Sequence, residues 1–216
     1  MKVKRMGHAA LLIETGSDRI LVDPGGFSDD WHGLEGLSAI LVTHQHADHV
    51  DAANLAGLVA NNRDARVLVE ESVVPILDSE GVPSESTRPG DRHAFGDLEI
   101  EVVGGRHAVI HERLPLVGNV GFVFDEGGGA RLYHPGDSYD YPLEGVDVLA
   151  LPLTAPWARV ETTVDFLEAV APSRAFPIHD AIVNDTGWNL YMRMAGQLGG
   201  EDVDLIHVDP TGEIEI

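Results

Sequence analysis

The chain has 216 residues, 44% of them hydrophobic, so it can bury a core and is expected to form one domain over residues 1–216. Its 36 acidic and 14 basic side chains give a net charge of −22, which argues against nucleic acid and membrane surfaces as partners, although solubility alone also explains such acidity. The lack of cysteine excludes disulfides and thiolate metal sites. No signal peptide and no apolar run of roughly 18 residues is recognisable, which predicts a cytoplasmic protein.

Apolar runs separated by turn residues predict strands and helices along the whole chain. Strands are expected at residues 2–6, 9–15, 19–22, 38–42, 66–69, 92–95, 98–103, 120–125, 131–134, 146–151, 174–177, 204–208 and 213–216. Helices are expected at residues 50–60, 72–79, 160–170 and 186–198. Tight turns are expected at Gly16-Ser17-Asp18 and at Gly96-Asp97. Early hairpins followed by mixed strands and helices predict two packed sheets with helices outside them.

The segment Thr43-His44-Gln45-His46-Ala47-Asp48-His49 places four potential metal ligands directly after the predicted strand 38–42. In an extended segment, residues two apart point the same way, so His44 and His46 can bind one ion together. Asp48 and His49 follow the bend into the next helix and face a second point close by. Imidazole and carboxylate ligands without thiolate suit zinc, manganese or iron.

Three later segments also carry ligand-type residues, and each follows a predicted strand. They are Gly104-Gly105-Arg106-His107 with His111 four residues on, His134-Pro135-Gly136-Asp137-Ser138, and His179-Asp180. Gly136 permits a tight turn that can present the Asp137 carboxylate. If these strand ends lie at one edge of the sheets, all of the loops meet at one rim.

Taken together, the motifs resemble those of the metallo-β-lactamase superfamily, whose hallmark is His-x-His-x-Asp-His. Within it, the chain is most similar to the branch of L-ascorbate-6-phosphate lactonase. The matching segments are Gly7-His8-Ala9, Ile20-Leu21-Val22-Asp23-Pro24-Gly25, Thr43 to His49, Tyr133-His134-Pro135-Gly136-Asp137-Ser138 and Pro177-Ile178-His179. The resemblance implies an α+β fold, the four-layer αββα sandwich.

The resemblance also implies a site for two divalent ions, most naturally zinc, with manganese and iron(II) as alternatives. The first ion would be bound by His44, His46 and His107, and the second by Asp48, His49 and His179. Asp137 would bridge the two ions. His111 is the alternative third ligand of the first ion, and we prefer His107 because it lies nearer the end of a strand.

Other residues are expected around the ligands or in the pocket. Asp23 follows a strand and in the family supports the ligands, although a turn carboxylate before Pro24-Gly25 is the simpler interpretation. His134 either supports the ligands or only packs, and His8 is core, support or substrate-facing. Aromatic and basic residues after the ligand loops are candidate pocket walls or anion partners, although the aromatic ones could equally cap the core: Arg106, Tyr139, Tyr141, Trp157, Arg159, Trp188 and Asn189.

These features predict a metal-dependent hydrolase of a small-molecule ester, lactone or phosphodiester. Two ions about 3.5–4 Å apart can lower the pKa of a shared water toward roughly 7, and the metal-bound hydroxide then attacks the substrate. Asp48 is also the candidate catalytic residue, because it could orient that water or pass a proton. An iron-dependent redox or oxygen-handling protein and a non-catalytic metal-binding protein are the alternatives. The sequence leaves the substrate, the metal and the oligomeric state open, a homo-oligomer included.

Overall fold

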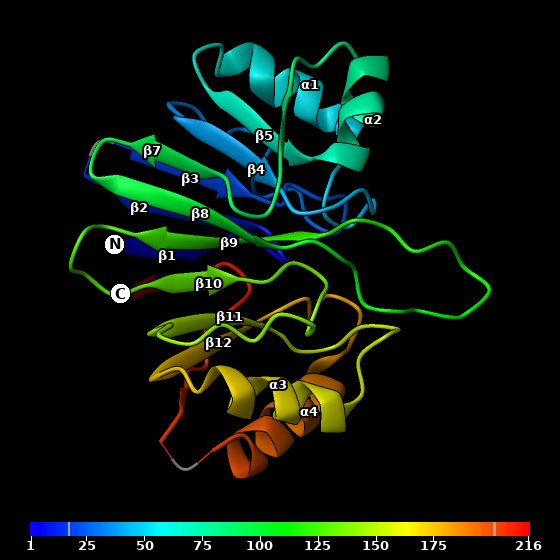
Figure 1. Ribbon diagram of the computed structural model, residues 1–216, viewed down its shortest axis with the longest axis vertical. Helices are drawn as coiled ribbons and strands as arrows, with labels where there is room; N and C mark the ends of the chain where they lie inside the picture. Colours follow the sequence, from blue (N-terminus) through cyan, green and yellow to red (C-terminus); the bar gives the residue numbers. More distant parts are fainter. Residues whose placement is uncertain (17, 201) are drawn as a thin grey trace.

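The computed structural model describes residues 1–16, 18–200 and 202–216, which form two seven-stranded sheets with helices outside them (Figure 1). The first sheet has the order β14 (Glu213–Glu215), β1 (Lys2–Arg5), β2 (Leu11–Thr15), β3 (Asp18–Val22), β4 (Ala39–Val42), β5 (Arg66–Glu70) and β6 (Glu85–Thr87). The second has the order β13 (Asp204–Leu205), β12 (Arg174–Ile178), β11 (Val148–Pro152), β10 (Leu132–His134), β9 (Val120–Asp125), β8 (Leu98–Gly104) and β7 (Arg92–Phe95).

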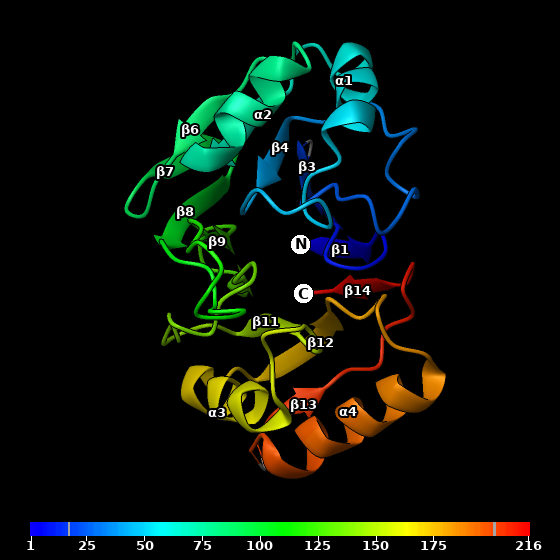
Figure 2. The same cartoon turned by 90° about the vertical axis from the view of Figure 1, so that its right-hand side faces the viewer.

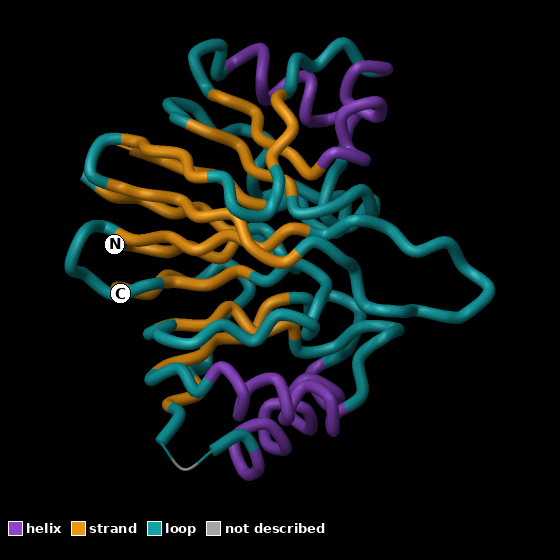
Figure 3. Tube along the Cα trace, in the orientation of Figure 1, coloured by secondary structure: helices purple, strands orange, loops and turns teal. Residues whose placement is uncertain are grey.

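The helices cover the outer faces of the two sheets, as the side view shows (Figure 2). The first sheet carries α1 (Ala52–Asn61), the short 3-10 turn η1 (Glu71–Val73) and α2 (Val74–Ser79). The second carries α3 (Val160–Val170) and α4 (Asp185–Leu198). The tube view shows the resulting order of layers, helix, sheet, sheet, helix (Figure 3). The predicted αββα sandwich of the α+β class is therefore confirmed.

Three apolar layers hold the sandwich together, and β4 shows why its sequence is apolar at every position. Ala39 and Leu41 point into the layer between the sheets, whereas Ile40 and Val42 point into the layer beneath α1 and α2. Successive side chains of a strand face opposite ways, and both faces of this strand are buried. A third layer joins the second sheet to α3 through residues such as Phe166. Among the described helices, none is long and apolar enough to cross a membrane.

Most predicted elements match the structure within one or two residues, but three differ. Strand β6 was not predicted because Glu85-Ser86-Thr87 is polar, and it pairs as an edge strand with β5. The predicted strand 204–208 is wrong beyond Leu205, because the chain leaves the sheet and Val208 O accepts a hydrogen bond from Arg5 instead. The predicted helix 72–79 is divided into η1 and α2. Ser17 of the predicted turn Gly16-Ser17-Asp18 lies outside the described residues.

Strand direction brings the motif-bearing loops to one edge of the sandwich. In the first sheet β3 and β4 run parallel, and in the second β10, β11 and β12 run parallel. Strand β8 lies two antiparallel steps from β10 and therefore has the same direction. A hydrogen bond of 2.9 Å from Val120 N to Thr43 O ties the two sheets together at this edge. The loops that follow these strands consequently meet there.

Candidate metal centre

Two groups of ligand-type side chains lie side by side at this edge. His44, His46, His107 and Asp137 form the first group, and His8, Asp48, His49 and His179 form the second. Within each group the candidate ligand atoms lie within 4.8 Å of one another. Asp137 also reaches the second group, with Oδ1 3.1 Å from His49 Nε2 and Oδ2 3.2 Å from His179 Nε2. The structure thus brings together all seven residues that the resemblance assigns to the metals, with Asp137 between the groups.

Hydrogen bonds to Nδ1 turn the Nε2 atoms of four histidines toward the site, where His44 Nε2 also lies 3.1 Å from His46 Nδ1. The four Nδ1 acceptors are Thr43 Oγ1 for His44 at 3.0 Å, Asp23 Oδ2 for His49 at 2.7 Å, Ala108 O for His107 at 2.5 Å and Thr154 O for His179 at 2.6 Å. Thr43 Oγ1 donates its own hydrogen to Asp23 Oδ2, so it can only accept from His44. These acceptors assign the proton of each neutral ring to Nδ1, an arrangement typical of metal-binding histidines.

Several of the inward-facing atoms are buried without a hydrogen-bond partner, which indicates that the site suits a cation. They are His49 Nε2, His107 Nε2, His179 Nε2 and Asp137 Oδ1. A buried polar atom without a partner costs about 1–3 kcal/mol. Carboxylate oxygens lie 3.1–3.4 Å from these nitrogens, and lone pairs facing anionic oxygens repel unless a positive charge lies between them. A proton or a divalent ion would supply that charge, and nitrogen and oxygen donors fit zinc, manganese or iron.

Asp23 supports the ligand loop through hydrogen bonds to Thr43 and His49. It is fully buried and accepts hydrogen bonds from Thr43 N and Thr43 Oγ1, both at 2.8 Å, in addition to the one from His49. Its φ of 47° is a strained conformation for a non-glycine residue, and such strain is common at functional sites. The next turn needs Gly25, since a Cβ there would lie 1.8 Å from Asp48 O.

Asp137 is held by residues for which the sequence gives little indication. Its backbone N–H donates to Asn119 Oδ1 at 2.9 Å, and its Oδ2 accepts from Trp157 Nε1 at 2.9 Å. Gly136 has a φ of 62°, and a Cβ there would lie 2.3 Å from Asn119 Oδ1. Neither Asn119 nor Thr154 was predicted at the site, because neither is a typical zinc ligand or belongs to a recognisable motif.

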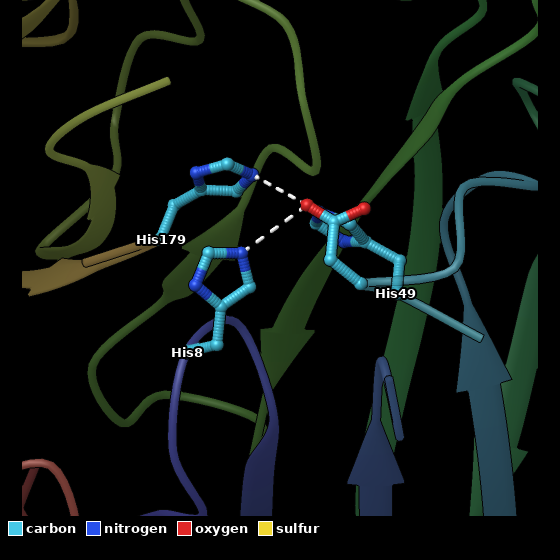
Figure 4. A group of neighbouring side chains, drawn as sticks. His8, His49 and His179 are labelled. Carbon is cyan, nitrogen blue, oxygen red and sulfur yellow. Dashed lines mark hydrogen bonds and ion pairs between the residues drawn. The ribbon is translucent and has the colours of Figure 1, made fainter. Parts of the chain in front are cut away.

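His8 has the opposite hydrogen-bond pattern to the other histidines. Its Nδ1 accepts from Ala181 N at 3.3 Å, so Nε2 carries the hydrogen and donates to Asp48 Oδ2 at 3.3 Å. Figure 4 shows His8 and His179 directed at this same carboxylate oxygen. The pattern makes His8 a support for Asp48 and leaves His179 as the residue with a free lone pair.

The remaining predicted site residues lie around these groups. His107, and not the exposed His111, lies with His44 and His46, while His111 lines an adjoining cavity. Both nitrogens of His134 bond to backbone atoms, Ala9 O and Gly136 N, so this ring ties loops together. The Tyr139 hydroxyl bonds to Pro152 O behind Trp157, which places the ring in the layer next to α3.

Two exposed arginines near the site are paired with neighbouring carboxylates. Arg106 Nε lies 2.9 Å from Asp140, and Arg159 Nη2 lies 3.2 Å from Glu161. Among the expected pocket walls, Trp188 and Asn189 line a second cavity near His8. The half-buried Trp157 faces Asp137, and Tyr141 is exposed.

Opposite charges shift the pKa values of the central groups. Burial alone would raise the pKa of Asp137 and of Asp48, but the histidines around each carboxyl lower it below the usual value. Burial would lower the pKa of His179, but Asp137 and Asp48 raise it to about 9, and Asp137 and Asp23 raise the pKa of His49. The carboxylates therefore favour the protonated form of both histidines in the metal-free centre, and a metal ion would replace these protons.

Comparisons with known proteins agree with this geometry. A family model described as a beta-lactamase superfamily domain matches residues 2–179. Protein Rv0786c of Mycobacterium tuberculosis is 44% identical over 88% of this chain and 89% of its own. A UPF0173 metal-dependent hydrolase of Carboxydothermus hydrogenoformans is 29% identical over 83% of this chain and 84% of its own. The metallo-beta-lactamase fold protein YhfI of Bacillus subtilis, at 14% identity, superposes with a TM-score of 0.75 over 99% of this chain and 98% of its own.

Proposed function

The chain belongs to the metallo-β-lactamase superfamily, and on that premise we propose that it is a hydrolase that binds two divalent metal ions, most naturally zinc. The observation that supports this best is the set of buried Nε2 and Oδ1 atoms without partners, all directed at one space between two ligand groups. Relatives named metal-dependent hydrolases support the reaction class. The narrower resemblance to the ascorbate-6-phosphate lactonase branch stays a prediction.

We propose that His44, His46 and His107 bind the first ion and that Asp48, His49 and His179 bind the second, with Asp137 shared. When bound, such a pair supplies Lewis acidity and a water of lowered pKa for attack on an ester, lactone or phosphodiester. Because the chain has no cysteine, the ions would be bound without thiolate ligands. The proposed reaction needs no serine or cysteine nucleophile.

The chain's own residues position and isolate the reacting groups. Thr43, Asp23 and Thr154 hold the histidine rings through Nδ1, so the Nε2 atoms already face the site before a metal binds. Asp48 is the more accessible carboxylate, with an 18% exposed side chain against 4% for Asp137. Asp48 can therefore accept a proton from attacking water and return it to the leaving group, with His8 fixing its orientation.

Metal analysis together with a substrate screen tests the proposal. The purified protein should contain two equivalents of metal, and it should hydrolyse a member of an ester, lactone, amide and phosphodiester panel in zinc, manganese or iron(II) buffer. His46→Ala should lower the metal content and abolish turnover, whereas His93→Ala on β7, which lies outside both ligand groups, should change neither.

Three results would count against it. Two bound metals with no turnover on the whole panel would indicate a non-catalytic metal-binding protein. Visible iron absorption with oxygen consumption would indicate redox chemistry. Full activity of His46→Ala would remove the assigned first site.

A further inference from the structure

The loop between β8 and β9, residues 105–119, extends from the edge of the sandwich beside the candidate metal centre (Figures 1 and 3). Its base is closed by hydrogen bonds from Gly105 N to Asn119 O at 2.8 Å and from His107 N to Val117 O at 3.1 Å. At the base it also carries the ligand candidate His107, and Ala108 N donates to Asp137 O at 2.8 Å. Hydrogen bonds thus hold both ends of the loop at its base, next to the site.

The outer part of this loop exposes four large apolar side chains. Val109 is 56% exposed, Ile110 38%, Leu114 52% and Leu116 63%. Large apolar residues that gather in one place on a surface mark a binding site more often than chance exposure does. In this chain the four apolar side chains lie next to the candidate metal centre.

These side chains form one wall of a cavity of about 200 Å³, and His46 and His107 belong to the same lining. No lysine, arginine, aspartate or glutamate is among the described residues that line it. A mainly apolar pocket that contains a few polar groups of the reacting centre is the usual form of a small-molecule site. The cavity is therefore suited to an uncharged apolar group of a molecule that reacts at the metals.

A substrate phosphate or carboxylate would find little to bind outside the metals. The larger cavity beside His8, about 580 Å³, is lined by five carboxylates and, among the described residues, by no lysine or arginine. Arg106 and Arg159 are already paired with Asp140 and Glu161, and Arg113, although it belongs to the β8–β9 loop, is not among the residues that line the apolar cavity. With a net charge of −22, the surface also repels anions. These features disfavour a phosphodiester or a phosphorylated lactone.

We infer that the β8–β9 loop receives the acyl part of an uncharged carboxylic ester or lactone, an inference that rests on the proposed function. An apolar cavity of about 150 Å³ holds benzene, so this cavity suits an acyl chain or ring of roughly six carbons. In the reaction, water oxygen bonds to the acyl carbon and the bond from that carbon to the alkoxy oxygen breaks. The departing oxygen takes a proton, and the products are a carboxylic acid and an alcohol.

A chain-length series with a constant leaving group tests this inference. The substrates are p-nitrophenyl acetate and hexanoate, with bis(p-nitrophenyl) phosphate as the anionic alternative. Each buried methylene contributes about a threefold to fourfold gain, and hexanoate has four more methylenes than acetate, so kcat/KM should rise roughly 80- to 250-fold. Turnover of the phosphodiester should be far lower than that of hexanoate.

Leu116→Asp should reduce this gain to less than about threefold while leaving the metal content unchanged, since Leu116 belongs to neither ligand group. Leu198→Asp, with a similarly exposed leucine at the end of α4, is the matched control and should keep the full gain. Binding supplies a second readout that does not depend on turnover. The affinity of the zinc-loaded protein for alkyl hydroxamic acids, measured by calorimetry, should rise with chain length in the wild type and not in Leu116→Asp.

The outcomes separate this inference from the proposed function. If the protein hydrolyses nothing with any metal but its affinity for hydroxamic acids rises with chain length, the hydrolase is rejected and the apolar acyl pocket is kept. If the protein hydrolyses esters but neither kcat/KM nor hydroxamate affinity rises with chain length, or if it prefers the phosphodiester, the hydrolase is kept and the pocket is rejected. If Leu116→Asp dissociates a dimer in analytical ultracentrifugation but kcat/KM and hydroxamate affinity still rise with chain length, the loop is a contact between copies of the chain. The inference is then wrong.

Discussion

The Asp23→Asn substitution tests whether hydrogen bonding to Nδ1 prepares His49 for metal binding. The carboxylate is fully buried and accepts the His49 Nδ1 hydrogen at 2.7 Å and the Thr43 Oγ1 hydrogen at 2.8 Å through the same oxygen, Oδ2. Asparagine keeps the shape but has only one acceptor oxygen. If its oxygen stays opposite Thr43 N, its NH2 faces His49 and favours the tautomer with the hydrogen on Nε2. That hydrogen would occupy the lone pair that the metal needs.

The expected loss is 10- to 100-fold in metal affinity, which corresponds to about 1.4–2.7 kcal/mol. The loss should be larger at the second site, because His49 loses its acceptor directly, whereas His44 of the first group is affected only through Thr43. Competition against a chromophoric chelator measures the two affinities separately, and Asp64→Asn, at an exposed position, is the control. Wild-type affinity at both sites in Asp23→Asn would refute the tautomer argument, as would an equal loss at both sites.

Three further predictions follow from packing, charge and proton linkage. Gly25→Ala should destabilise the protein by about 2 kcal/mol or more in urea unfolding, because the added Cβ would lie 1.8 Å from a backbone oxygen; Gly57→Ala in α1, where the Cβ meets nothing, should instead stabilise it by about 0.5–1 kcal/mol. Arg5→Met breaks a buried ion pair of 2.7 Å to Asp180 and should cost about 3–5 kcal/mol, whereas Arg92→Met at the surface should cost less than about 1 kcal/mol; equal costs would contradict the argument. The pKa of His179 is raised to about 9, so its contribution to the stability of the metal-free protein is present below the unfolded value near 6.5 and is lost as pH rises through 9. Zinc should remove this decline and add about 2.7 kcal/mol at a free concentration 100 times its Kd; parallel pH profiles with and without zinc would show that zinc does not replace that proton.

The sequence was most informative where chemistry and local pattern coincide. His44, His46, Asp48 and His49 are recognisable because metal ligands must be imidazole or carboxylate and because their spacing follows a buried strand. Three of the four predicted helices match the structure within two residues, and 160–170 matches α3 at both ends. The polar edge strand β6 was not predicted, because a strand can pair at the edge of a sheet without an apolar periodicity.

The choice between His107 and His111 needed the structure. Both histidines follow the same strand and carry the same ligand atoms, and only the path of the β8–β9 loop separates them. The role of His8 was equally undetermined, since the proton position on its ring follows from Ala181 N, a donor 173 residues away in sequence.

The amino-acid order by itself determined which ligand types are present, that each follows a strand, and which superfamily the chain resembles. Only the tertiary structure decided which residues face one another across the two sheets. Asn119, Thr154 and Trp157 act on the ligands through hydrogen bonds between distant segments, and these depend on strand order and direction. The apolar cavity has the same origin, because it forms only where a loop of the second sheet passes the histidines of the first.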